Sequence, residues 1–576
     1  MRAFRLCAAY PVLALVLHGC GGGGGGGGGS AVNPAPVPAP TSVALQGVVT
    51  FDRVPAVAGA GLDYANTVER PARGVTVQLV GANGVLASTT TDAAGRYSFT
   101  VAANTDVSLR VRAEMVQIGS PSWDFRVVDN VNSNALYVLA GSVFNSGVAD
   151  LTRDLHAASG WDGTSYAMAR SAAPFAILDV VYAAVQVVLG AAPNADFPAL
   201  QIRWSTGNVP VSGSAAGQIG DSHFIPGVGI ELLGAANQDT DEYDRHVIAH
   251  EWGHYLEHAF SRSDSIGGAH TLSDQLDMRV ALSEGWGNAF SAIATGEPVY
   301  VDTFGAGQAR NFSFDLEQRP SRRNPNPGWF NEEAVQSLLY DLYDNGRDVP
   351  PGTTTLDDLA LGFAPLFAVL SGDQRQTPAL TSVFSLVDAL KRQRPADVPL
   401  IDQLAASQGI QPIVDRYGST ETNFGVPTKR TAQEVGADFH SVYDELTVGG
   451  AAVNVCSLDD YTSALTGAVN KLASRRFVRF TVTAPGPHVI TARAVAPLNG
   501  AADPDLQLHL PDGSVLSSTG PPHCTAATPQ DCVETFTPSL AAGDHVLEVY
   551  EWTNTNDTDD QYPPVGRTCF DVTVVR

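Results

Sequence analysis

Two histidines four residues apart, His250 and His254, lie near the middle of a chain of 576 residues. The residues around them fit a helix with one buried face, with apolar side chains at Val247, Ile248, Tyr255 and Leu256. Positions i and i+4 share a helix face, so both imidazoles can reach one metal ion. Glu251 stands beside them, where it can act as the general base for a water that the metal activates.

A third candidate ligand, Glu284, follows His254 by 30 positions. It lies in a second predicted helix that begins in the segment 281–290. A structural zinc site uses four protein ligands, whereas a catalytic site uses three and leaves one position open for water. Two histidines and one glutamate therefore predict a catalytic Zn²⁺ site with His250, His254 and Glu284 as its metal ligands.

This pattern, His-Glu-x-x-His with a later Glu in the run Glu284-Gly285-Trp286, resembles the gluzincin metallopeptidases of the thermolysin and fungalysin type. The resemblance implies a zincin-like catalytic domain in which Glu251 is the catalytic base and carries the proton to the leaving nitrogen. In those families an Asp four positions after the third ligand binds a ligand histidine. Here that position is Asn288, which can accept the hydrogen bond but lacks the charge that raises ligand basicity.

The group that would stabilise the oxyanion is not evident from the sequence. Thermolysin relatives use a later histidine, and this chain has none between His270 and His440. Tyr340 and Tyr343 on a predicted helix are candidates, but packing or capping of that helix is the favoured explanation for both, so no residue is assigned.

A predicted strand at 227–234 precedes the histidine helix. The resemblance implies that it forms the sheet edge along which a peptide substrate lies. The alternative is an ordinary core strand.

The histidine row continues in both directions along the helix. His246 and His258 extend the i+4 spacing, and we expect them to lie behind the ligands or at the surface. Asp244 and Glu257 are interpreted as solvated helix charges.

Composition limits the possible functions. The chain carries 34 basic and 60 acidic residues, a net charge of −26, which argues against nucleic-acid binding because that requires a basic face. A hydrophobic content of 44% and a mean hydropathy of −0.01 indicate a folded, soluble protein. The length indicates several domains.

The first residues look like an export signal. Arg2 and Arg5 precede an apolar run at 6–17 that is too short to span a membrane, and Leu17-His18-Gly19-Cys20 resembles a bacterial lipobox. We therefore expect a lipoprotein signal peptide at 1–20, a lipid anchor on Cys20 that holds the chain to a membrane, and a Gly/Pro-rich linker at 21–41. The alternative is a cleaved secretory signal. Either way, the chain is expected in the bacterial cell envelope, at the outer membrane, or outside the cell.

Two β-rich regions flank the predicted peptidase domain at 116–450. The region 42–115 alternates apolar and polar residues and, through the run Thr91-Asp92-Ala93-Ala94-Gly95, resembles a carboxypeptidase-regulatory-like β-sandwich. The region 451–576, with Asp503-Pro504-Asp505, resembles a pre-peptidase C-terminal β-sandwich. The predicted fold class is thus multidomain α+β, with a zincin-like domain between two all-β sandwiches.

Apart from Cys7 in the signal peptide and Cys20 at the anchor, the chain has four cysteines, and all lie in the last 125 residues. In an exported domain they predict two disulfide bonds with three possible connectivities. We favour Cys524–Cys532 and Cys456–Cys569. A zinc site is the alternative, although the spacing matches no zinc ribbon or finger.

The sequence thus predicts an exported zinc metallopeptidase that hydrolyses peptide bonds in a protein or peptide substrate. Two alternatives stay open. One is a non-catalytic cell-surface binding protein, or adhesin, with a degenerate zinc site. The other is a zinc amidase that acts on cell-wall peptide.

Overall fold

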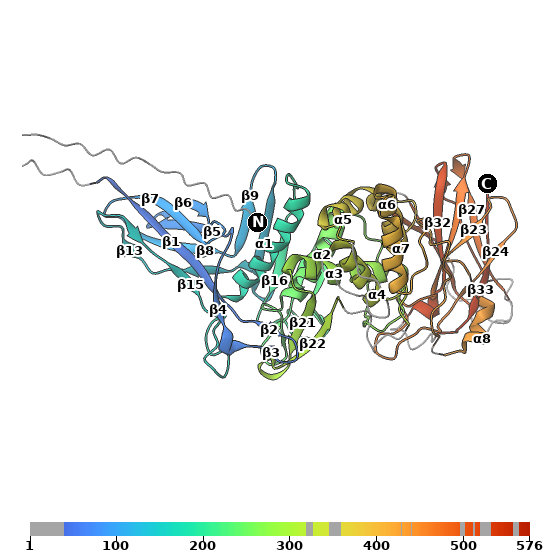
Figure 1. The fold of residues 1–576 in the computed structure, drawn as a ribbon, viewed down its shortest axis with the longest axis horizontal. Coiled ribbons are helices and arrows are strands. Elements are labelled where there is room, and N and C mark those ends of the chain that lie inside the picture. Colours follow the sequence, from blue (N-terminus) through green and yellow to red (C-terminus); the bar gives the residue numbers. More distant parts are fainter. Residues whose placement is uncertain are drawn as a thin grey trace, which may run out of the picture.

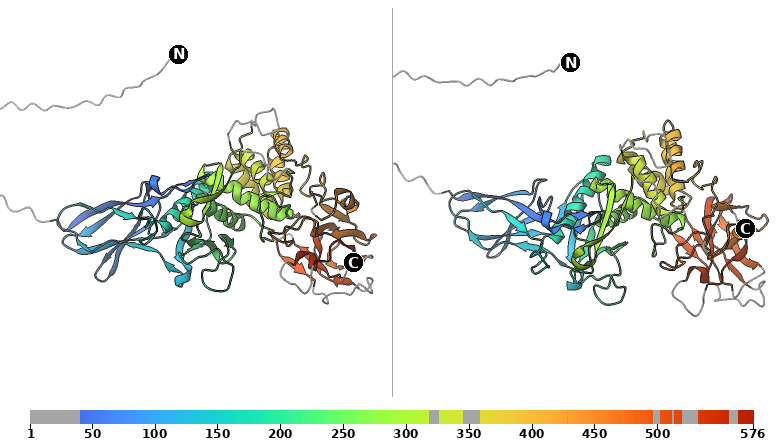
Figure 2. Two further views of the ribbon diagram at one scale, coloured as in Figure 1. Left: turned by 90° about the horizontal axis from the view of Figure 1, so that it is seen from below. Right: turned by 60° about the horizontal axis from the view of Figure 1, so that its bottom comes forward.

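The computed structural model describes residues 40–317, 326–344, 359–427, 429–438, 440–495, 502–510, 513–518, 532–556 and 564–576. The predicted signal peptide with Cys20, most of the linker, and Cys524 lie outside these residues. The molecule is elongated, and three parts follow one another along its long axis (Figure 1). Two further views show the same succession of a β-rich part, a mixed part and a second β-rich part (Figure 2). A multidomain chain with many β-sheets is therefore confirmed, whereas the zincin-like nature of the middle part stays a prediction.

The first part is built around the long strand β1, Ser42–Arg53. Every second residue of this strand is buried along its first ten positions, which fits a sheet with one face in a core. Its sheet also holds β4 (Val68–Pro71), β7 (Arg96–Ala102), β14 (Leu151–Thr152) and β15 (Leu155–Ala157). A second sheet holds β5 (Thr76–Gly81), β6 (Gly84–Thr90), β8 (Asp106–Arg112), β12 (Val138–Ala140) and β13 (Phe144–Asn145). The two sheets thus include strands up to Ala157, whereas the first β-rich region was predicted to end at residue 115.

The middle part contains a mixed sheet in the order β11-β10-β16-β18-β17, with β9 on the far side of β10. The strands are β9 (Glu114–Gln117), β10 (Trp123–Asp129), β11 (Ala135–Leu136), β16 (Leu200–Trp204), β17 (His223–Ile225) and β18 (Gly229–Leu232). Strands β10, β16 and β18 run parallel, and β17 runs antiparallel to β18. The prediction that the strand near 227–234 forms the sheet edge is wrong. Because β17 pairs with its outer side, β18 is a core strand and β17 is the edge.

Helix α1, Ala173–Ala191, provides the crossover that parallel strands require between β10 and β16. It is long and apolar enough to cross a membrane, but 61% of that apolar stretch is buried inside the fold. The burial fits the sequence of this helix, which is apolar along most of its length.

Among the residues that the structure describes, six further helices form the other half of the middle part. They are α2 (Arg245–Phe260), α3 (Met278–Thr295), α4 (Glu332–Tyr343), α5 (Phe363–Val369), α6 (Val383–Gln393) and α7 (Val398–Ser407). Helix α3 lies between α2 and α4 and is buried along almost its whole length. A small antiparallel sheet lies beside α2, with β19 (Gly234–Ala235), β20 (Asp239–Thr240), β21 (Val299–Phe304) and β22 (Arg310–Asp315). The hairpin of β2 (Ala56–Val57) and β3 (Gly61–Leu62) reaches from the first part to β21.

The last part consists of two facing sheets with a common apolar core. One sheet has the order β23-β25-β32-β28-β29, formed by β23 (Tyr443–Leu446), β25 (Arg475–Val482), β32 (Gly543–Glu551), β28 (Pro504–His509) and β29 (Val515–Ser517). The other has the order β24-β33-β27-β30, formed by β24 (Val453–Ser457), β33 (Thr568–Val575), β27 (Val489–Val495) and β30 (Val533–Phe536). The short strands β26 (Gly486–Pro487) and β31 (Ser539–Leu540) pair with each other, and α8 (Ala432–Val435) precedes β23.

A disulfide joins Cys456 of β24 to Cys569 of β33, which confirms one of the two predicted pairs. The pairing of Cys524 with Cys532 cannot be followed, because Cys524 lies outside the described residues.

A buried ion pair joins the last part to helix α3. Arg279 of α3 donates from Nη1 to the Glu548 carboxylate of β32 at 2.8 Å, and both side chains are at most 1% exposed. Arg475 and His509 contact the same carboxylate. Because α3 also carries Glu284, the C-terminal part contributes to the position of the helix that holds the third predicted ligand.

Candidate metal centre

Glycines allow α2, α3 and α4 to pack closely around the predicted site. A Cβ on Gly287 would lie 2.8 Å from two ring atoms of His250, so this position of α3 must be a glycine if the imidazole is to rest against the helix. A Cβ on Gly285 would lie 2.8 Å from Val335 of α4. Trp286 fixes the α2–α3 contact by donating its indole N–H to the Gly253 carbonyl at 3.1 Å. The run Gly285-Trp286-Gly287 is therefore explained by helix packing.

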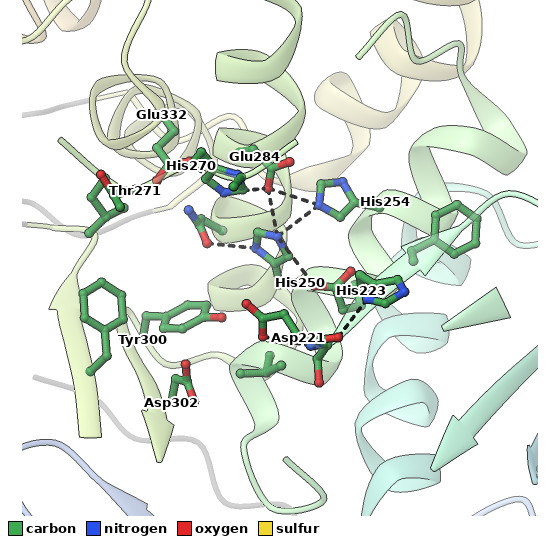
Figure 3. Close-up of a pocket in the computed structure, with 18 of the residues that line it drawn as sticks. Asp221, His223, His250, His254, His270, Thr271, Glu284, Tyr300, Asp302 and Glu332 are labelled. Atoms are coloured by element: carbon green, nitrogen blue, oxygen red, sulfur yellow. Dashed lines mark hydrogen bonds and ion pairs between the residues drawn. The ribbon is translucent and has the colours of Figure 1, made fainter. Parts of the chain in front are cut away.

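The structure brings the three predicted ligands together (Figure 3). The Nε2 atoms of His250 and His254 are 3.0 Å apart, and Glu284 Oε2 lies 3.3 and 3.4 Å from them. Two ligands of a tetrahedral zinc ion with bonds of 2.0 to 2.1 Å stand roughly 3.3 to 3.4 Å apart. The spacing of this donor set therefore fits a single zinc ion.

Hydrogen bonds on the far side of both rings orient Nε2 toward that point. His250 Nδ1 faces Asn288 Oδ1 at 2.8 Å, and Asn288 in turn donates to Gln336 Oε1 at 2.7 Å. An amide oxygen can only accept, so His250 carries its proton on Nδ1 and leaves Nε2 free to bind a metal. Asn288 thus contacts His250 as the sequence leads us to expect, and its effect on metal binding stays a prediction.

His254 is oriented through Ser283 and Glu257. Its Nδ1 lies 3.3 Å from Ser283 Oγ, which donates to Glu257 Oε2 at 2.8 Å. The prediction that Glu257 is a solvated charge is wrong, because its side chain is 3% exposed, and burial raises its pKa to about 7 while His254 opposes the rise. This connection was missed because Ser283 and Glu257 come from two helices whose contact cannot be read from the sequence.

Asp244 is also buried. Its carboxylate accepts the backbone N–H of Thr303 at 2.7 Å and the Thr303 hydroxyl, and it ties the start of α2 to β21. The prediction of a solvated charge is wrong here too. His246 is buried behind the site with Nδ1 3.0 Å from Ser291 Oγ, and His258 is exposed.

Glu251 lies beside the triad and outside it. Its nearer oxygen is 4.0 Å from His250 Nε2, and its side chain faces the same cavity as the triad. Burial raises the pKa of its carboxyl to about 8, while the nearby His250 acts in the opposite direction. For Glu284 the result is the opposite. Burial alone would raise its pKa, but the nearby His270 and His254 outweigh burial and hold the pKa well below its usual range.

The site opens into a cavity of about 1030 Å³. The edge strand β17 contributes His223 and Phe224, and β21 contributes Tyr300, whose ring points from the strand toward the middle of the cavity (Figure 3). The described residues that line the cavity include seven carboxylates and no Lys or Arg. These carboxylates are Asp221, Asp239, Asp241, Glu251, Glu284, Asp302 and Glu332. The cavity therefore favours cationic groups over anionic ones.

His270 is the main residue of the site that the sequence did not single out. Its Nε2 lies 3.3 Å from Glu284 Oε2 and 3.3 Å from Glu332 Oε2. Although burial lowers the pKa of His270, the two carboxylates outweigh that effect and raise it to about 9. Neither Tyr340 nor Tyr343 is among the described residues that line the cavity, so these two candidates for the oxyanion do not reach the site.

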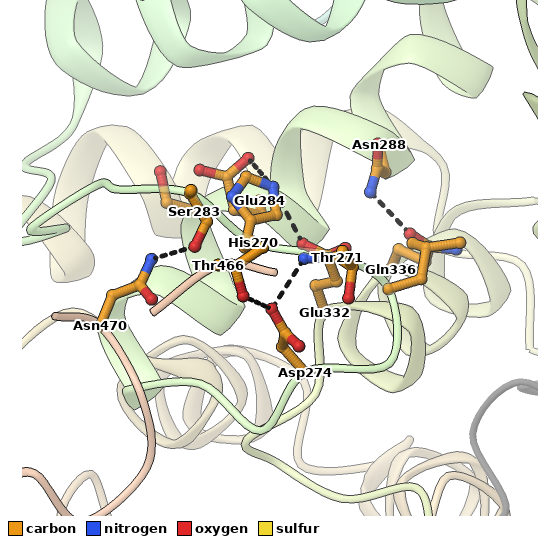
Figure 4. A network of polar contacts seen from close by, with 12 residues as sticks. His270, Thr271, Asp274, Ser283, Glu284, Asn288, Glu332, Gln336, Thr466 and Asn470 are labelled. Carbon is orange, nitrogen blue, oxygen red and sulfur yellow. Dashed lines mark hydrogen bonds and ion pairs between the residues drawn. The ribbon is translucent and has the colours of Figure 1, made fainter. Parts of the chain in front are cut away.

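Contacts from the C-terminal part hold the loop that carries His270 (Figure 4). Asn470 donates to the Gly267 carbonyl at 2.9 Å, and Lys471 donates to the Ala269 carbonyl at 3.2 Å. The Thr466 hydroxyl donates to Asp274 at 2.6 Å. The only signal in the sequence that could have pointed to this arrangement is a histidine between two predicted ligands, because the loop shows no periodicity.

Comparison with known proteins adds little to this geometry. No family model matches the chain, and no curated protein matches it. Among solved structures, the pre-peptidase C-terminal domain of collagenase from Bacillus anthracis matches at 9% identity with a TM-score of 0.15, over 23% of this chain and 93% of that one. A putative carbohydrate binding protein from Pseudomonas aeruginosa matches at 11% identity with a TM-score of 0.13, over 21% of this chain and 92% of that one. The periplasmic g-type lysozyme inhibitor PliG from Aeromonas hydrophila matches at 13% identity with a TM-score of 0.12, over 23% and 98%.

Proposed function

We propose that this chain is an exported zinc metallopeptidase that hydrolyses peptide bonds in protein or peptide substrates. The observation that carries the proposal is the triad of His250, His254 and Glu284, with both imidazoles oriented by outer hydrogen bonds and with Glu251 beside them in one open cavity. Two histidines and one glutamate are a donor set that zinc uses in catalytic sites.

When bound, a zinc ion in this triad would polarise the scissile carbonyl and lower the pKa of a water nearby. The chain's own contribution begins with Glu251. Its carboxylate takes a proton from the attacking water and delivers it to the leaving nitrogen, which needs a base within reach of both atoms. Glu251 fits this role because its side chain is buried, faces the cavity and is not needed as a metal ligand.

Strand β17 supports a peptide as the substrate. It is the edge strand of the mixed sheet and borders the cavity with His223 and Phe224. An extended peptide can pair with the open side of such a strand, which holds the scissile bond in a fixed direction. The edge strand also lies close to the proposed base, because the backbone of Phe224 is near enough to Glu251 to lower its pKa slightly.

Export is supported by the disulfide between Cys456 and Cys569, because disulfides persist in oxidising compartments. A lipid anchor on Cys20 remains part of the proposal.

The test is removal and return of the metal. Treatment of the full chain with 1,10-phenanthroline is expected to abolish cleavage of casein, and addition of Zn²⁺ at a slight excess is expected to restore it. A parallel assay on purified peptidoglycan separates a peptidase from a cell-wall amidase. Zinc binding without turnover of either substrate would contradict the proposal and favour a non-catalytic binding protein.

A further inference from the structure

The described residues contain a second group of metal-binding side chains in the same cavity. Atoms of His270, Glu284 and Glu332 that can bind a metal all lie within 4.8 Å of one another. This second triad shares Glu284 with the first triad and has no other member in common with it. We propose that His270, Glu332 and the shared Glu284 bind a second divalent metal ion beside the first. The proposal rests on the proposed zinc site, because Glu284 would bridge the two ions.

Two distances of the second triad match those of the first, and the third lies within 4.8 Å. His270 Nε2 lies 3.3 Å from Glu284 Oε2 and 3.3 Å from Glu332 Oε2 (Figure 4). Ligands at ordinary zinc bond lengths stand roughly that far apart around one ion. A histidine nitrogen with two carboxylates suits Zn²⁺ and related divalent ions with mixed nitrogen and oxygen ligands.

Glu332 gives an independent reason to expect a cation. Its side chain is 3% exposed, and Oε2 accepts no hydrogen bond from any residue that the structure describes. A buried carboxylate oxygen without a donor is costly unless a cation faces it. The helix dipole of α4 offsets part of this cost, because Glu332 follows the N-cap Asn331 at the positive end of the helix. The oxygen itself faces Nε2 of His270 at 3.3 Å, the two atoms that the proposed ion would join.

The ring of His270 is oriented for metal binding. Its Nδ1 lies 3.1 Å from the Gly268 carbonyl oxygen, which can only accept a hydrogen bond. Nε2 is therefore the ring nitrogen that faces Glu284 and Glu332. Without a metal it can carry a second proton and bridge the two carboxylates, and a bound metal ion would take the place of that proton.

Anchored neighbours hold both ends of the loop with His270. Asn470 donates to the Gly267 carbonyl before the histidine, and Asn331 donates to the Leu272 carbonyl at 2.8 Å after it. The donors come from the C-terminal part and from the start of α4, next to Glu332. Ligands that are fixed before binding lose little entropy when the metal arrives.

The experiment counts zinc in the full chain. Protein stripped with a chelator is titrated with Zn²⁺, excess metal is removed, and bound zinc per chain is measured by mass spectrometry of the native protein and by elemental analysis. The wild type is expected to bind two ions. His270→Ala and Glu332→Gln are each expected to bind one, and so is His250→Ala. The matched control is His258→Ala, an exposed histidine of α2 outside both triads, which is expected to keep two.

One zinc ion in the wild type and one in His270→Ala would overturn the second site while the proposed function stands, since His270 would then act only as a protonated bridge between the two glutamates. No zinc in the wild type would refute the proposed function as well. Should His270→Ala fail to fold, Glu332→Gln gives the same comparison, because it keeps the shape of the side chain and removes its charge. Two equivalents in the wild type and in both His270→Ala and Glu332→Gln would also overturn the proposal, because the second ion would then lie elsewhere, for example at Asp239, Asp241 and Asp302 in the same cavity.

Discussion

Asn288 gives the sharpest test of how this site orients its ligands. Its Oδ1 accepts a hydrogen bond from His250 Nδ1 at 2.8 Å, and its Nδ2 donates one to Gln336 Oε1 at 2.7 Å. In Asn288→Ala, His250 loses the acceptor that fixes its tautomer and its ring angle. Gln336 Oε1 loses its donor inside a site where Gln336 is 1% exposed.

The size of the effect follows from these two losses. Removal of a residue that orients a metal-binding histidine typically weakens metal binding about 10- to 100-fold. That range corresponds to about 1.4 to 2.7 kcal/mol, comparable to one lost hydrogen bond together with one unpaired buried acceptor. We therefore expect the Kd for Zn²⁺ to rise by this factor. Asn288→Asp should bind zinc at least as tightly as the wild type, because a carboxylate makes the histidine a stronger ligand.

The assay is competition for Zn²⁺ against a coloured chelator of known affinity, with circular dichroism to show that each variant is folded. Asn194→Ala, at an exposed position, is the control and should leave the Kd unchanged. An Asn288→Ala variant that is folded and binds zinc like the wild type would refute the reasoning that outer hydrogen bonds set the geometry of this site.

Three further variants probe the packing and charge around the site. Gly287→Ala places a methyl group 2.8 Å from the ring of His250, so we expect at least a tenfold loss of zinc affinity in the same competition assay. Glu548→Gln removes the charge that faces the buried Arg279; we expect a loss of about 3 kcal/mol in the free energy of unfolding, measured with urea. Asp221→Asn removes one exposed carboxylate from the lining of the cavity, so the preference for peptides with Lys or Arg over peptides with Glu, measured as a ratio of kcat/KM, should fall.

Each of these variants has a clear contrary result. Gly190→Ala in α1 has open space around its new methyl group and should be tolerated, so equal effects at Gly190 and Gly287 would contradict the packing argument. Unchanged urea unfolding for Glu548→Gln would mean that the ion pair contributes no net stability. A wild-type preference for basic peptides that does not weaken with added salt would argue against an electrostatic origin.

The local patterns of the sequence predict the chemistry of the first triad better than its surroundings. His250, His254 and Glu251 share a helix face because helical spacing requires it, and the structure brings Glu284 to them. His270 and Glu332 were not predicted, because one lies in an irregular loop and the other at a helix start. Their contact with Glu284 depends on how three distant segments pack.

In the fold, too, local features could be predicted from the sequence, whereas features that depend on contacts between distant segments could not. The buried helix at α1 follows from its continuous apolar run. The extent of the first part was harder to predict, because β14 and β15 return to pair in parallel with β1 across about a hundred residues. The edge of the mixed sheet was misassigned because β17 has only three residues and carries a polar His223 at its start. Burial of Asp244 and Glu257 could not be seen from spacing, since charged helix positions usually face water.

The central claim, peptide hydrolysis with Glu251 as the base, is tested most directly by Glu251→Gln. This change keeps the size of the side chain and leaves all three predicted zinc ligands in place. Zinc content and cleavage of a fluorogenic peptide library are measured on the same preparation of the variant and of the wild type. The account predicts unchanged zinc in the first triad and a fall in kcat of about 100- to 10,000-fold. Cleavage at the wild-type rate by a zinc-loaded Glu251→Gln variant would contradict it.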